Sequence, residues 1–343
     1  MKNNYFAGKK VLVTGGTGSW GHELIHQLIE RYPEVSEIRV LSRGEHKQVE
    51  MHQEFTGDKR LRFIIGDVRN KDIVNHATHG VNVIFHLAAL KHVPVCEDNS
   101  WEAVLTNIIG TENIIESAIE NNVETVVDVS TDKAVEPFNL YGVTKACGEK
   151  LMINANTYYN SVRSSKTKFI CIRGGNVIGT NGSVIPLFKK QIREKNEITV
   201  TDGYMTRFLM TTRDAIGLIF TAFENSIGGE LFVMRMPGAT LTTIANTMVK
   251  LFGNDKTKIT TIGLRPGEKR HEVLVSKNEA PFTKVFSPEY FLILPQTRDR
   301  SLYKEYIKYP EFKDIEFTSS STKILSEIEL EQTLRKEKWL FSD

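Results

Sequence analysis

The sequence has little cysteine and almost no net charge. Only three cysteines, Cys96, Cys147 and Cys171, are spread over 343 residues. This usage excludes a disulfide-stapled scaffold and favours a reducing cytosol, so we interpret all three as ordinary buried thiols. The formal net charge is +2 and the basic residues are scattered, which leaves no electrostatic footprint for nucleic acid or an anionic membrane surface.

Long apolar runs and clustered metal ligands are also missing. No stretch of the sequence approaches the roughly 20 apolar residues of a membrane-spanning helix, and the polar segment 1–10 has no signal-peptide pattern. The nine histidines show no ligand spacing with cysteines or carboxylates. We therefore expect a cytoplasmic protein without a membrane span and without a metal site.

What the sequence does contain is an alternation of short strands and helices. Hydrophobic residues make up 40% of the chain, and a prior of roughly 150 residues per domain suggests two lobes. β-branched runs at 10–14, 37–41, 62–65, 81–86, 125–130 and 168–173 are separated by helical patterns such as 22–31 and 101–121. This alternation predicts an α/β fold, a doubly wound parallel sheet of the Rossmann type.

The second half of the chain has looser patterning. Glycine, proline and threonine punctuate shorter elements, and a late helix is expected at 326–336. We assign residues 1–180 to a dinucleotide-binding Rossmann domain and residues 181–343 mainly to a smaller substrate-binding lobe. The chain is allowed to cross between the lobes more than once.

A glycine-rich turn follows the first expected strand. Glycines at such spacing let the backbone approach a pyrophosphate, whose charge the N-terminus of the next helix stabilises. The candidate cofactor-binding residues in this turn are Gly15, Thr17, Gly18, Ser19 and Gly21. The strand before the turn and the helix after it supply the context that so short a motif lacks on its own.

The end of the second expected strand favours NADP over NAD. An NAD site carries an acidic residue there, whereas this chain has Ser42 and Arg43, which suit a 2′-phosphate, with Lys47 one helical turn later. The alternative is a solvated basic loop, which nearby Glu45 supports. Asp67, Val68, Ala88 and Ala89 follow the third and fourth expected strands. The candidate cofactor site also includes Lys91, Tyr141 and Lys145.

Tyr141 and Lys145 are the most informative pair. Being four residues apart, they share one face of a helix, so we expect the ammonium to lower the pKa of the phenol from its reference value of about 10. A phenolate near neutrality is a usable base. The alternative is a packed tyrosine beside a surface lysine, but the position one loop after the fifth expected strand favours catalysis.

The glycine-rich turn with Tyr141 and Lys145 resembles the extended short-chain dehydrogenase/reductase superfamily. Within it, the segment 130–134 (Ser-Thr-Asp-Lys-Ala) resembles the inverting UDP-N-acetylglucosamine 4,6-dehydratases of capsule and flagellin-sugar biosynthesis. The resemblance runs from about residue 8 to residue 275, with further matches at 88–94, 106–113, 182–186, 205–208 and 265–269. Retaining relatives carry Asp-Glu where this chain has Asp132 and Lys133.

The resemblance implies a mechanism. Tyr141 removes the proton of the sugar 4-hydroxyl while hydride passes to NADP⁺, and Thr131 hydrogen-bonds the same oxygen. Lys133 takes the proton on C5 as a neutral amine, for which we expect burial and nearby cations to lower its pKa from about 10.4. Asp132 protonates the departing 6-hydroxyl. Hydride then returns to C6, and protonation of C5 on the opposite face gives an L-configured 4-keto sugar.

The resemblance also implies a UDP-sugar pocket in the smaller lobe. Arg207 and Arg265 are candidates for the pyrophosphate, Asn176 contacts the phosphates, and Glu268 reaches the ribose. Lys91 lies near the sugar and the cofactor, and Val184 belongs to a matching segment. One departure stands out, because Gly174 occupies a position where the family commonly has tyrosine, so an aromatic side chain beside the sugar is lost.

Three alternatives remain open. A UDP-hexose 4-epimerase or a retaining 4,6-dehydratase shares the fold, the cofactor and the pair Tyr141 and Lys145, whereas Asp132 and Lys133 argue against both. An NADP or nucleotide-sugar sensor without turnover is a different class, and it has no need of an activated phenol. Self-association into a homo-oligomer is expected only by analogy with similar enzymes.

Overall fold

A computed structural model describes residues 5–180, 183–264, 267–296, 301–337 and 340–341. Its centre is a nine-stranded sheet in the order β14-β15-β10-β6-β5-β4-β1-β2-β3. The strands are β1 (Lys10–Thr14), β2 (Glu37–Ser42), β3 (Leu61–Ile65), β4 (Val83–His86), β5 (Thr125–Thr131), β6 (Lys168–Gly174), β10 (Leu231–Met234), β14 (Thr283–Val285) and β15 (Tyr290–Ile293). Neighbouring strands pair parallel except at one edge, where β15 runs antiparallel to both β10 and β14.

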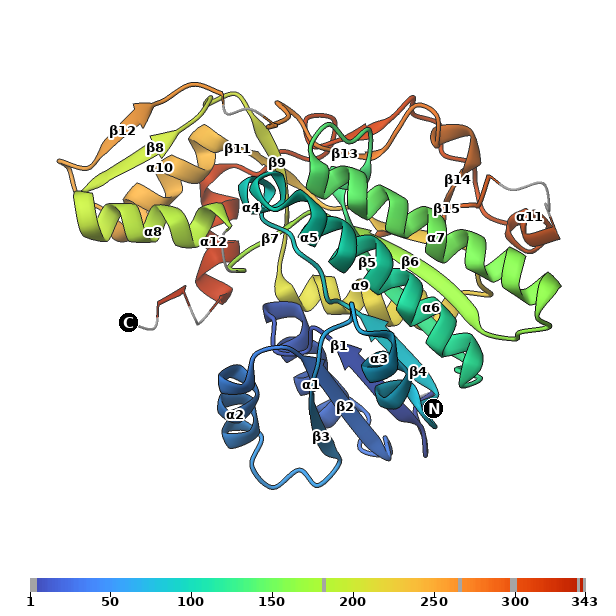
Figure 1. The fold of residues 1–343 in the computed structure, drawn as a ribbon. Coiled ribbons are helices and arrows are strands. Elements are labelled where there is room, and N and C mark those ends of the chain that lie inside the picture. The colour runs from blue at the N-terminus through green and yellow to red at the C-terminus, as the bar shows by residue number, and fades with distance from the viewer. Residues whose placement is uncertain (1–4, 181–182, 265–266, 297–300, 338–339, 342–343) are drawn as a thin grey trace.

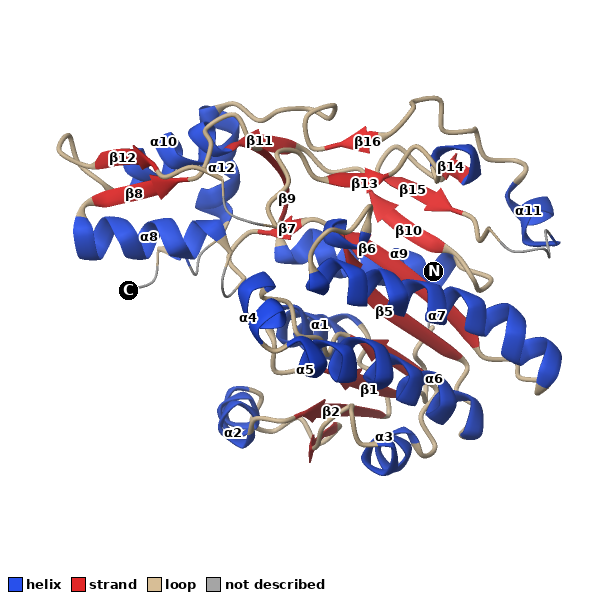
Figure 2. Ribbon diagram, turned by 45° about the horizontal axis from the view of Figure 1, so that its top comes forward, coloured by secondary structure: helices blue, strands red, loops and turns tan. Residues whose placement is uncertain are grey.

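Helices cover both faces of this sheet (Figures 1 and 2). One face carries α3 (Lys71–Thr78), α6 (Gly110–Glu120) and α7 (Leu140–Val162), and the other carries α1 (Ser19–Arg31), α2 (Glu45–Glu54) and α9 (Thr212–Asn225). Successive strand residues point to opposite faces, so Leu12 packs in the first core and Val11 and Val13 pack in the second. The doubly wound α/β fold predicted from the sequence is confirmed.

A smaller lobe lies at one end of the sheet, on the left in Figure 1. Its helices α8 (Val184–Lys195), α10 (Leu241–Phe252) and α12 (Glu327–Lys336) and the paired strands β8 (Glu197–Val200) and β12 (Lys258–Thr261) enclose a separate core. Phe188, Ile198, Ile244 and Leu330 are buried there. The helix expected at 326–336 is therefore α12, and Ser326 caps it through the N–H of Glu329.

Short strands link the two lobes. The chain forms the sheet β11-β9-β7 from β7 (Asn176–Val177), β9 (Thr206–Met210) and β11 (Gly238–Thr240), and the pair β13 (Val273–Val275) and β16 (Phe317–Thr318). Because β10, β14 and β15 rejoin the main sheet after residue 180, the chain crosses between the lobes repeatedly. The remaining elements are α4 (Val93–Asp98), α5 (Ser100–Val104), α11 (Ser301–Tyr306), the π-helical η1 (Leu105–Ile109) and the 3₁₀ turns η2 (Asp132–Ala134) and η3 (Ala280–Phe282).

The sequence-based view of the cysteines needs one correction. Cys96 and Cys171 are buried free thiols, but Cys147 is only partly buried because it lies on a side of α7 that the core does not fully cover. Across the described part of the chain, no helix combines the length and apolarity needed to cross a bilayer. The same residues contain no group of three or more His, Cys, Asp or Glu that could hold a metal ion.

Candidate active site

The glycine-rich turn between β1 and α1 is shaped by close backbone packing. Gly15 has φ +67°, and a Cβ there would lie 2.8 Å from the backbone nitrogen of Ala88. A Cβ on Gly21 would lie 2.4 Å from Cα of Gly16. Only glycine fits such approaches. Gly18 caps α1 without a side chain, so the first amides of that helix face outward from the turn.

The end of β2 presents two exposed cations beside this turn. Arg43 and Lys47 border the same cleft as the glycines, while the Ser42 hydroxyl accepts a hydrogen bond from Gln48 Nε2 at 2.9 Å. Asp67, after β3, is held by Arg69 at 2.6 Å. Burial alone would raise the pKa of the Asp67 carboxyl, but its contacts with Arg69 outweigh burial and lower the pKa.

A single cleft of about 1320 Å³ runs from the turn to the smaller lobe. It brings together all but two of the residues singled out from the sequence. Those lining it are Gly15, Thr17, Gly18, Ser19, Gly21, Ser42, Arg43, Lys47, Asp67, Val68, Ala88, Ala89, Lys91, Thr131, Lys133, Tyr141, Lys145, Asn176, Val184, Arg207 and Glu268. Asp132 lies fully buried beneath its wall, and Arg265 falls outside the described residues.

Tyr141 and Lys145 lie in the first two turns of α7, as their spacing predicts. Asn139 starts this helix by accepting a hydrogen bond from the N–H of Gly142 at 2.8 Å. Both Tyr141 and Lys145 are buried. The Lys145 ammonium forms an ion pair with Asp128 of β5, whose carboxylate oxygens lie 3.4 and 3.5 Å from Nζ.

The expected pKa of Tyr141 requires a correction. Its pKa is raised above the ordinary phenol value because desolvation in the wall of the cleft disfavours the phenolate. Lys145 does lower the pKa, as the spacing suggests, and so do Lys133 and a hydrogen bond with Thr131. Together these contributions lower the pKa by less than burial raises it. The extent of burial cannot be predicted from a spacing of four residues.

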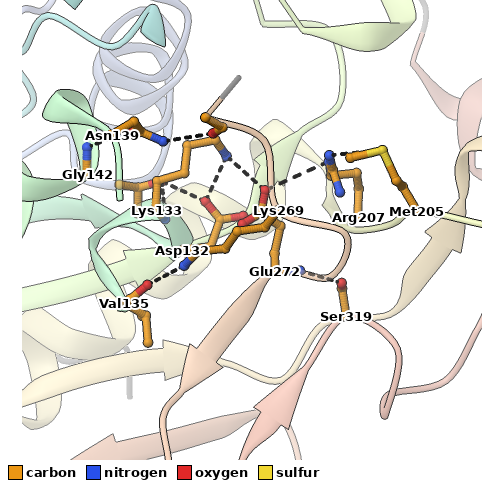
Figure 3. A network of polar contacts seen from close by, with 12 residues as sticks. Asp132, Lys133, Val135, Asn139, Gly142, Met205, Arg207, Lys269, Glu272 and Ser319 are labelled. Carbon is orange, nitrogen blue, oxygen red and sulfur yellow. Dashed lines mark hydrogen bonds and ion pairs between the residues drawn. The ribbon is translucent and has the colours of Figure 1, made fainter. Parts of the chain in front are cut away.

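The loop after β5 holds Thr131, Asp132 and Lys133 in a compact hydrogen-bonded turn. The Thr131 hydroxyl donates to Oδ1 of Asp132 at 2.8 Å and accepts the N–H of Lys133 at 3.3 Å. Lys133 Nζ lies 3.0 Å from the same Oδ1 and 3.7 Å from Oε1 of Glu272 (Figure 3). The lysine thus lies between two carboxylates, one from each half of the chain.

The expectation that Lys133 has a lowered pKa is wrong. Burial does act to lower the pKa, but Asp132, Glu272 and Tyr141 act in the opposite direction and raise it above the ordinary lysine value. The expected cations are present, since Lys91 and Lys269 both face Lys133. The carboxylates decide the sign of the shift. Asp132 and Glu272 lie 3.0 and 3.7 Å from Nζ, so the ammonium form of Lys133 is favoured.

Sequence reasoning missed two acidic residues of the site. Asp128 is a charged residue inside an otherwise apolar buried strand, and that pattern was a usable signal because buried carboxylates need a partner. Glu272 follows the matching segment 265–269 by three residues. Its sequence context carried no comparable signal, because only the folding of the second lobe onto the catalytic loop brings it to Lys133.

The wall of the cleft formed by the smaller lobe carries the other candidate substrate groups. Arg207 on β9 is buried, and its Nη1 donates to the carbonyl oxygens of Thr206 at 2.8 Å and Arg270 at 3.3 Å. Glu268 also faces the cleft, and its buried Oε2 has no hydrogen-bond partner among the residues that the structure describes. Such a carboxylate oxygen is suited to accept a hydrogen bond from a ligand hydroxyl.

Another aromatic side chain, Trp20, lies beside Gly174, where the family commonly has a tyrosine. A Cβ on Gly174 would lie 3.1 Å from the indole ring of Trp20 and 3.4 Å from Sδ of Met210. Trp20 is the second residue of α1 and borders the same cleft. The aromatic surface lost from β6 is therefore supplied by the helix of the glycine-rich turn, and it occupies the volume that a larger residue 174 would need.

Comparisons with known proteins agree with this architecture. Residues 11–293 match the model of a family described as polysaccharide biosynthesis protein. The chain is 40% identical over 334 residues to a Rickettsia canadensis (strain McKiel) protein named UDP-glucose 4-epimerase, a match that covers 96% of each chain. The X-ray structure of Pen from Bacillus thuringiensis superposes with a TM-score of 0.90 at 38% identity, covering 98% of this chain and 100% of that one.

A more distant structure shares the fold alone. DesIV, a dTDP-glucose 4,6-dehydratase from Streptomyces venezuelae solved with NAD and TYD bound, has a TM-score of 0.66 at 24% identity. The match covers 76% of this chain and 86% of DesIV. The likeness is to the arrangement of sheet and helices.

Proposed function

The chain belongs to the family of polysaccharide biosynthesis proteins, within the extended short-chain dehydrogenase/reductase superfamily, and we propose that it is an NADP-dependent, C5-inverting 4,6-dehydratase of UDP-N-acetylglucosamine. The coarser class is a nucleotide-sugar enzyme of the dehydratase and epimerase kind. A cytoplasmic location, a homo-oligomeric state and the division at residue 180 stay predictions.

The observation that carries the proposal is the position of Lys133. Its ammonium borders the cleft, beside the tyrosine that a 4-oxidation requires, and forms an ion pair with Asp132. A simple epimerase needs only the tyrosine and its neighbours, because no bond to C5 or C6 changes. An acid and a base adjacent to that tyrosine are what elimination across C5 and C6 demands.

The residues of the turn fit a dinucleotide phosphate. Gly15 lets the turn pack directly against the backbone of Ala88, where a Cβ would lie 2.8 Å away, and the N-terminus of α1, which has no side-chain cap, favours a pyrophosphate. Arg43 and Lys47 suit a 2′-phosphate. When bound, NADP would accept a hydride from C4 of the sugar and return it to C6.

The first step uses the residues of α7 and β5. Tyr141 takes the proton of the sugar 4-hydroxyl, and Lys145, held charged by Asp128, stabilises the phenolate that this step needs. Thr131 hydrogen-bonds the same oxygen. Because burial raises the pKa of Tyr141, the phenolate that accepts this proton depends on the opposing charges of Lys145 and Lys133.

The elimination step uses Asp132 and Lys133 as one unit. Lys133 passes a proton to Asp132 across their 3.0 Å contact, which creates an amine base and a carboxylic acid together. The amine takes the proton on C5, the C–H electron pair forms the C5–C6 double bond, and the C6–O bond breaks. Because Asp132 is buried beneath the wall of the cleft, its proton passes through the Thr131 hydroxyl, which lies 2.8 Å from Oδ1 and borders the cleft, to the leaving oxygen, which departs as water. The ion pair is then restored, so no external acid or base is consumed.

A second candidate function has a specific observation in its favour. Several relatives at about 40% identity carry the name UDP-glucose 4-epimerase, and an epimerase would use the same Tyr141 and Lys145. The two functions differ at C5 and C6 of the sugar. Only dehydration exchanges the hydrogen on C5 with solvent and converts C6 to a methyl group.

Proton NMR in deuterated water tests the proposal directly. The protein is incubated with UDP-N-acetylglucosamine, first as purified and then with added NADP⁺. We expect a new 6-methyl signal, deuterium at C5 and an inverted C5 configuration. A change confined to C4 would support the epimerase, retention at C5 would support a retaining dehydratase, and absence of any change with NADP⁺ would refute this substrate.

A further inference from the structure

Glu272 connects the second lobe to the catalytic loop. It directly precedes β13, and its backbone is fixed by Ser319, whose Oγ accepts the Glu272 N–H at 2.9 Å and whose N–H donates to the Glu272 carbonyl at 2.8 Å. The residue is 3% exposed but borders the cleft. The backbone that carries this carboxylate is therefore fixed at the place where the two lobes meet.

One oxygen of this carboxylate faces two cations. Oε1 lies 3.7 Å from Nζ of Lys133 and 3.8 Å from Nε of Arg207, as Figure 3 shows. Oε2 is buried and has no hydrogen-bond partner in the described ranges. The residue that we assign to the C5 proton and the residue that we assign to the pyrophosphate thus share a single carboxylate oxygen as their ion-pair partner.

Lys133 needs a second anchor because Asp132 alone cannot orient it. A lysine side chain has a flexible stem of four carbons and three equivalent N–H donors. Because Asp132 is its neighbour in sequence, the two side chains can stay in contact while the ammonium points in many directions. Glu272 comes from a different part of the chain, so its ion pair with Lys133 fixes the direction in which the ammonium points. A displacement of about 1 Å is enough to slow a positioned proton transfer by about 100-fold.

We propose that Glu272 is a positioning residue for the C5 proton transfer, which aims Lys133 at the sugar and links that aim to the arginine that holds the substrate phosphates. The inference rests on the proposed dehydratase function. A pyrophosphate that drew Arg207 away from Oε1 would leave this oxygen to Lys133. The lysine is then held most firmly when substrate occupies the smaller lobe.

The test separates the C4 step from the C5 step. Under single-turnover conditions with UDP-N-acetylglucosamine in deuterated water, formation of reduced nicotinamide reports C4 oxidation and deuterium at C5 reports proton transfer. Glu272→Gln keeps the size of the side chain and removes its charge. We expect C4 oxidation to change by less than about threefold and C5 exchange to fall by about 100-fold, so that reduced cofactor accumulates.

Two further variants complete the design. Glu272→Asp keeps the charge on a shorter stem, and we expect it to regain a measurable part of the C5 exchange. Glu311→Gln removes a carboxylate from an exposed ion pair with Lys284 and should leave the ratio of the two rates unchanged. If Glu272→Gln does not fold, the ratio of C5 exchange to C4 oxidation is measured in Glu272→Asp instead. A ratio equal to that of the unaltered protein would then overturn the inference.

The outcomes are distinct. Equal slowing of both steps, or a rise in KM with both rates retained, would show that Glu272 serves only folding or substrate binding and would overturn the inference. If the unaltered protein forms neither reduced cofactor nor C5-deuterated sugar, the proposed function itself has failed. That result is obtained before any variant is made, so the two failures cannot be confused.

Discussion

The two ends of the cleft are built by different physical means. At the cofactor end, the geometry is set by backbone, because Gly15 and Gly21 allow contacts that any side chain would block. At the catalytic end, the geometry is set by buried charges that meet from distant parts of the chain, such as Lys133 with Glu272. The first kind of site is local in sequence, and the second exists only after the lobes have assembled.

This difference determines what each end tolerates. A backbone cradle depends on the absence of side chains, so its chemistry changes little with pH. A buried charge network depends on the mutual compensation of its members, and removing one leaves another without its partner in a place where water cannot replace it. We expect substitutions at the two ends to fail in different ways.

The largest effect is expected at the catalytic end. In the proposed mechanism Tyr141 takes the 4-hydroxyl proton, so Tyr141→Phe should lower turnover by about 1000-fold. Cofactor binding, measured by titration of the protein with NADP⁺, should be nearly unchanged, because the phosphate cradle lies at the other end of the cleft. A comparable loss of affinity would mean that the two ends are not separable.

The next largest effect concerns stability. Asp128→Asn leaves the Lys145 ammonium buried without a counter-charge, which should cost about 3 kcal/mol of unfolding free energy in urea denaturation. The exposed pair of Glu311 and Lys284 provides the comparison, since Glu311→Gln should cost well under about 1 kcal/mol. Equal costs would show that the buried pair contributes no more than a surface pair.

At the cofactor end the expected effect is one of selectivity. Arg43→Ala should weaken NADP⁺ binding by about tenfold through the lost charge-assisted contact with the 2′-phosphate, while NAD⁺ binding stays the same. Calorimetric titration with each cofactor provides the measurement. A parallel loss for both cofactors would remove Arg43 from phosphate recognition and leave NAD as the better assignment.

The smallest effect is a dependence of stability on pH. His86 is buried next to Thr14 and Asp128, and burial lowers its pKa to about 4. An unfolded histidine has a pKa near 6.5. Between these two pH values the unfolded state binds a proton on His86 and the folded state does not. Stability is therefore lost as pH falls from about 6.5 towards 4.

Between pH 7.5 and pH 5.5, both about one unit from the unfolded pKa, this should remove about 1 kcal/mol of unfolding free energy. The comparison is with His86→Phe, whose own stability is measured at the same two pH values. The difference between the two proteins isolates the histidine from other titrating groups. An identical pH dependence in both would place the effect elsewhere.

The sequence predicted most of the fold because its strands are marked by local patterns. The expected strand at 10–14 is β1, and 125–130 differs from β5 only at its last residue. The helix expected at 101–121 is divided by a π-helical segment at 105–109, which a pattern of apolar residues does not distinguish.

The site was predictable to a lesser degree, for a physical reason. Spacing alone brings Tyr141 and Lys145 to one helix face, but the sign of a pKa shift depends on every charge within several ångströms. The pKa shift of Lys133 was predicted with the wrong sign. The sequence does not show that Glu272, 139 positions away, lies beside this lysine. Trp20 was missed for the same reason, since Gly174 meets it only across the folded sheet.

The fit between Trp20 and Gly174 constrains how this chain can evolve. A Cβ at position 174 would already lie 3.1 Å from the Trp20 ring, so we expect a tyrosine there to force that ring to move. Shrinking Trp20 alone is expected to open a void in the wall of the cleft. Each single change is harmful, whereas the two together exchange one aromatic wall for another. The two positions are therefore epistatic, and homologues are expected to carry a large residue at one of them and a small residue at the other.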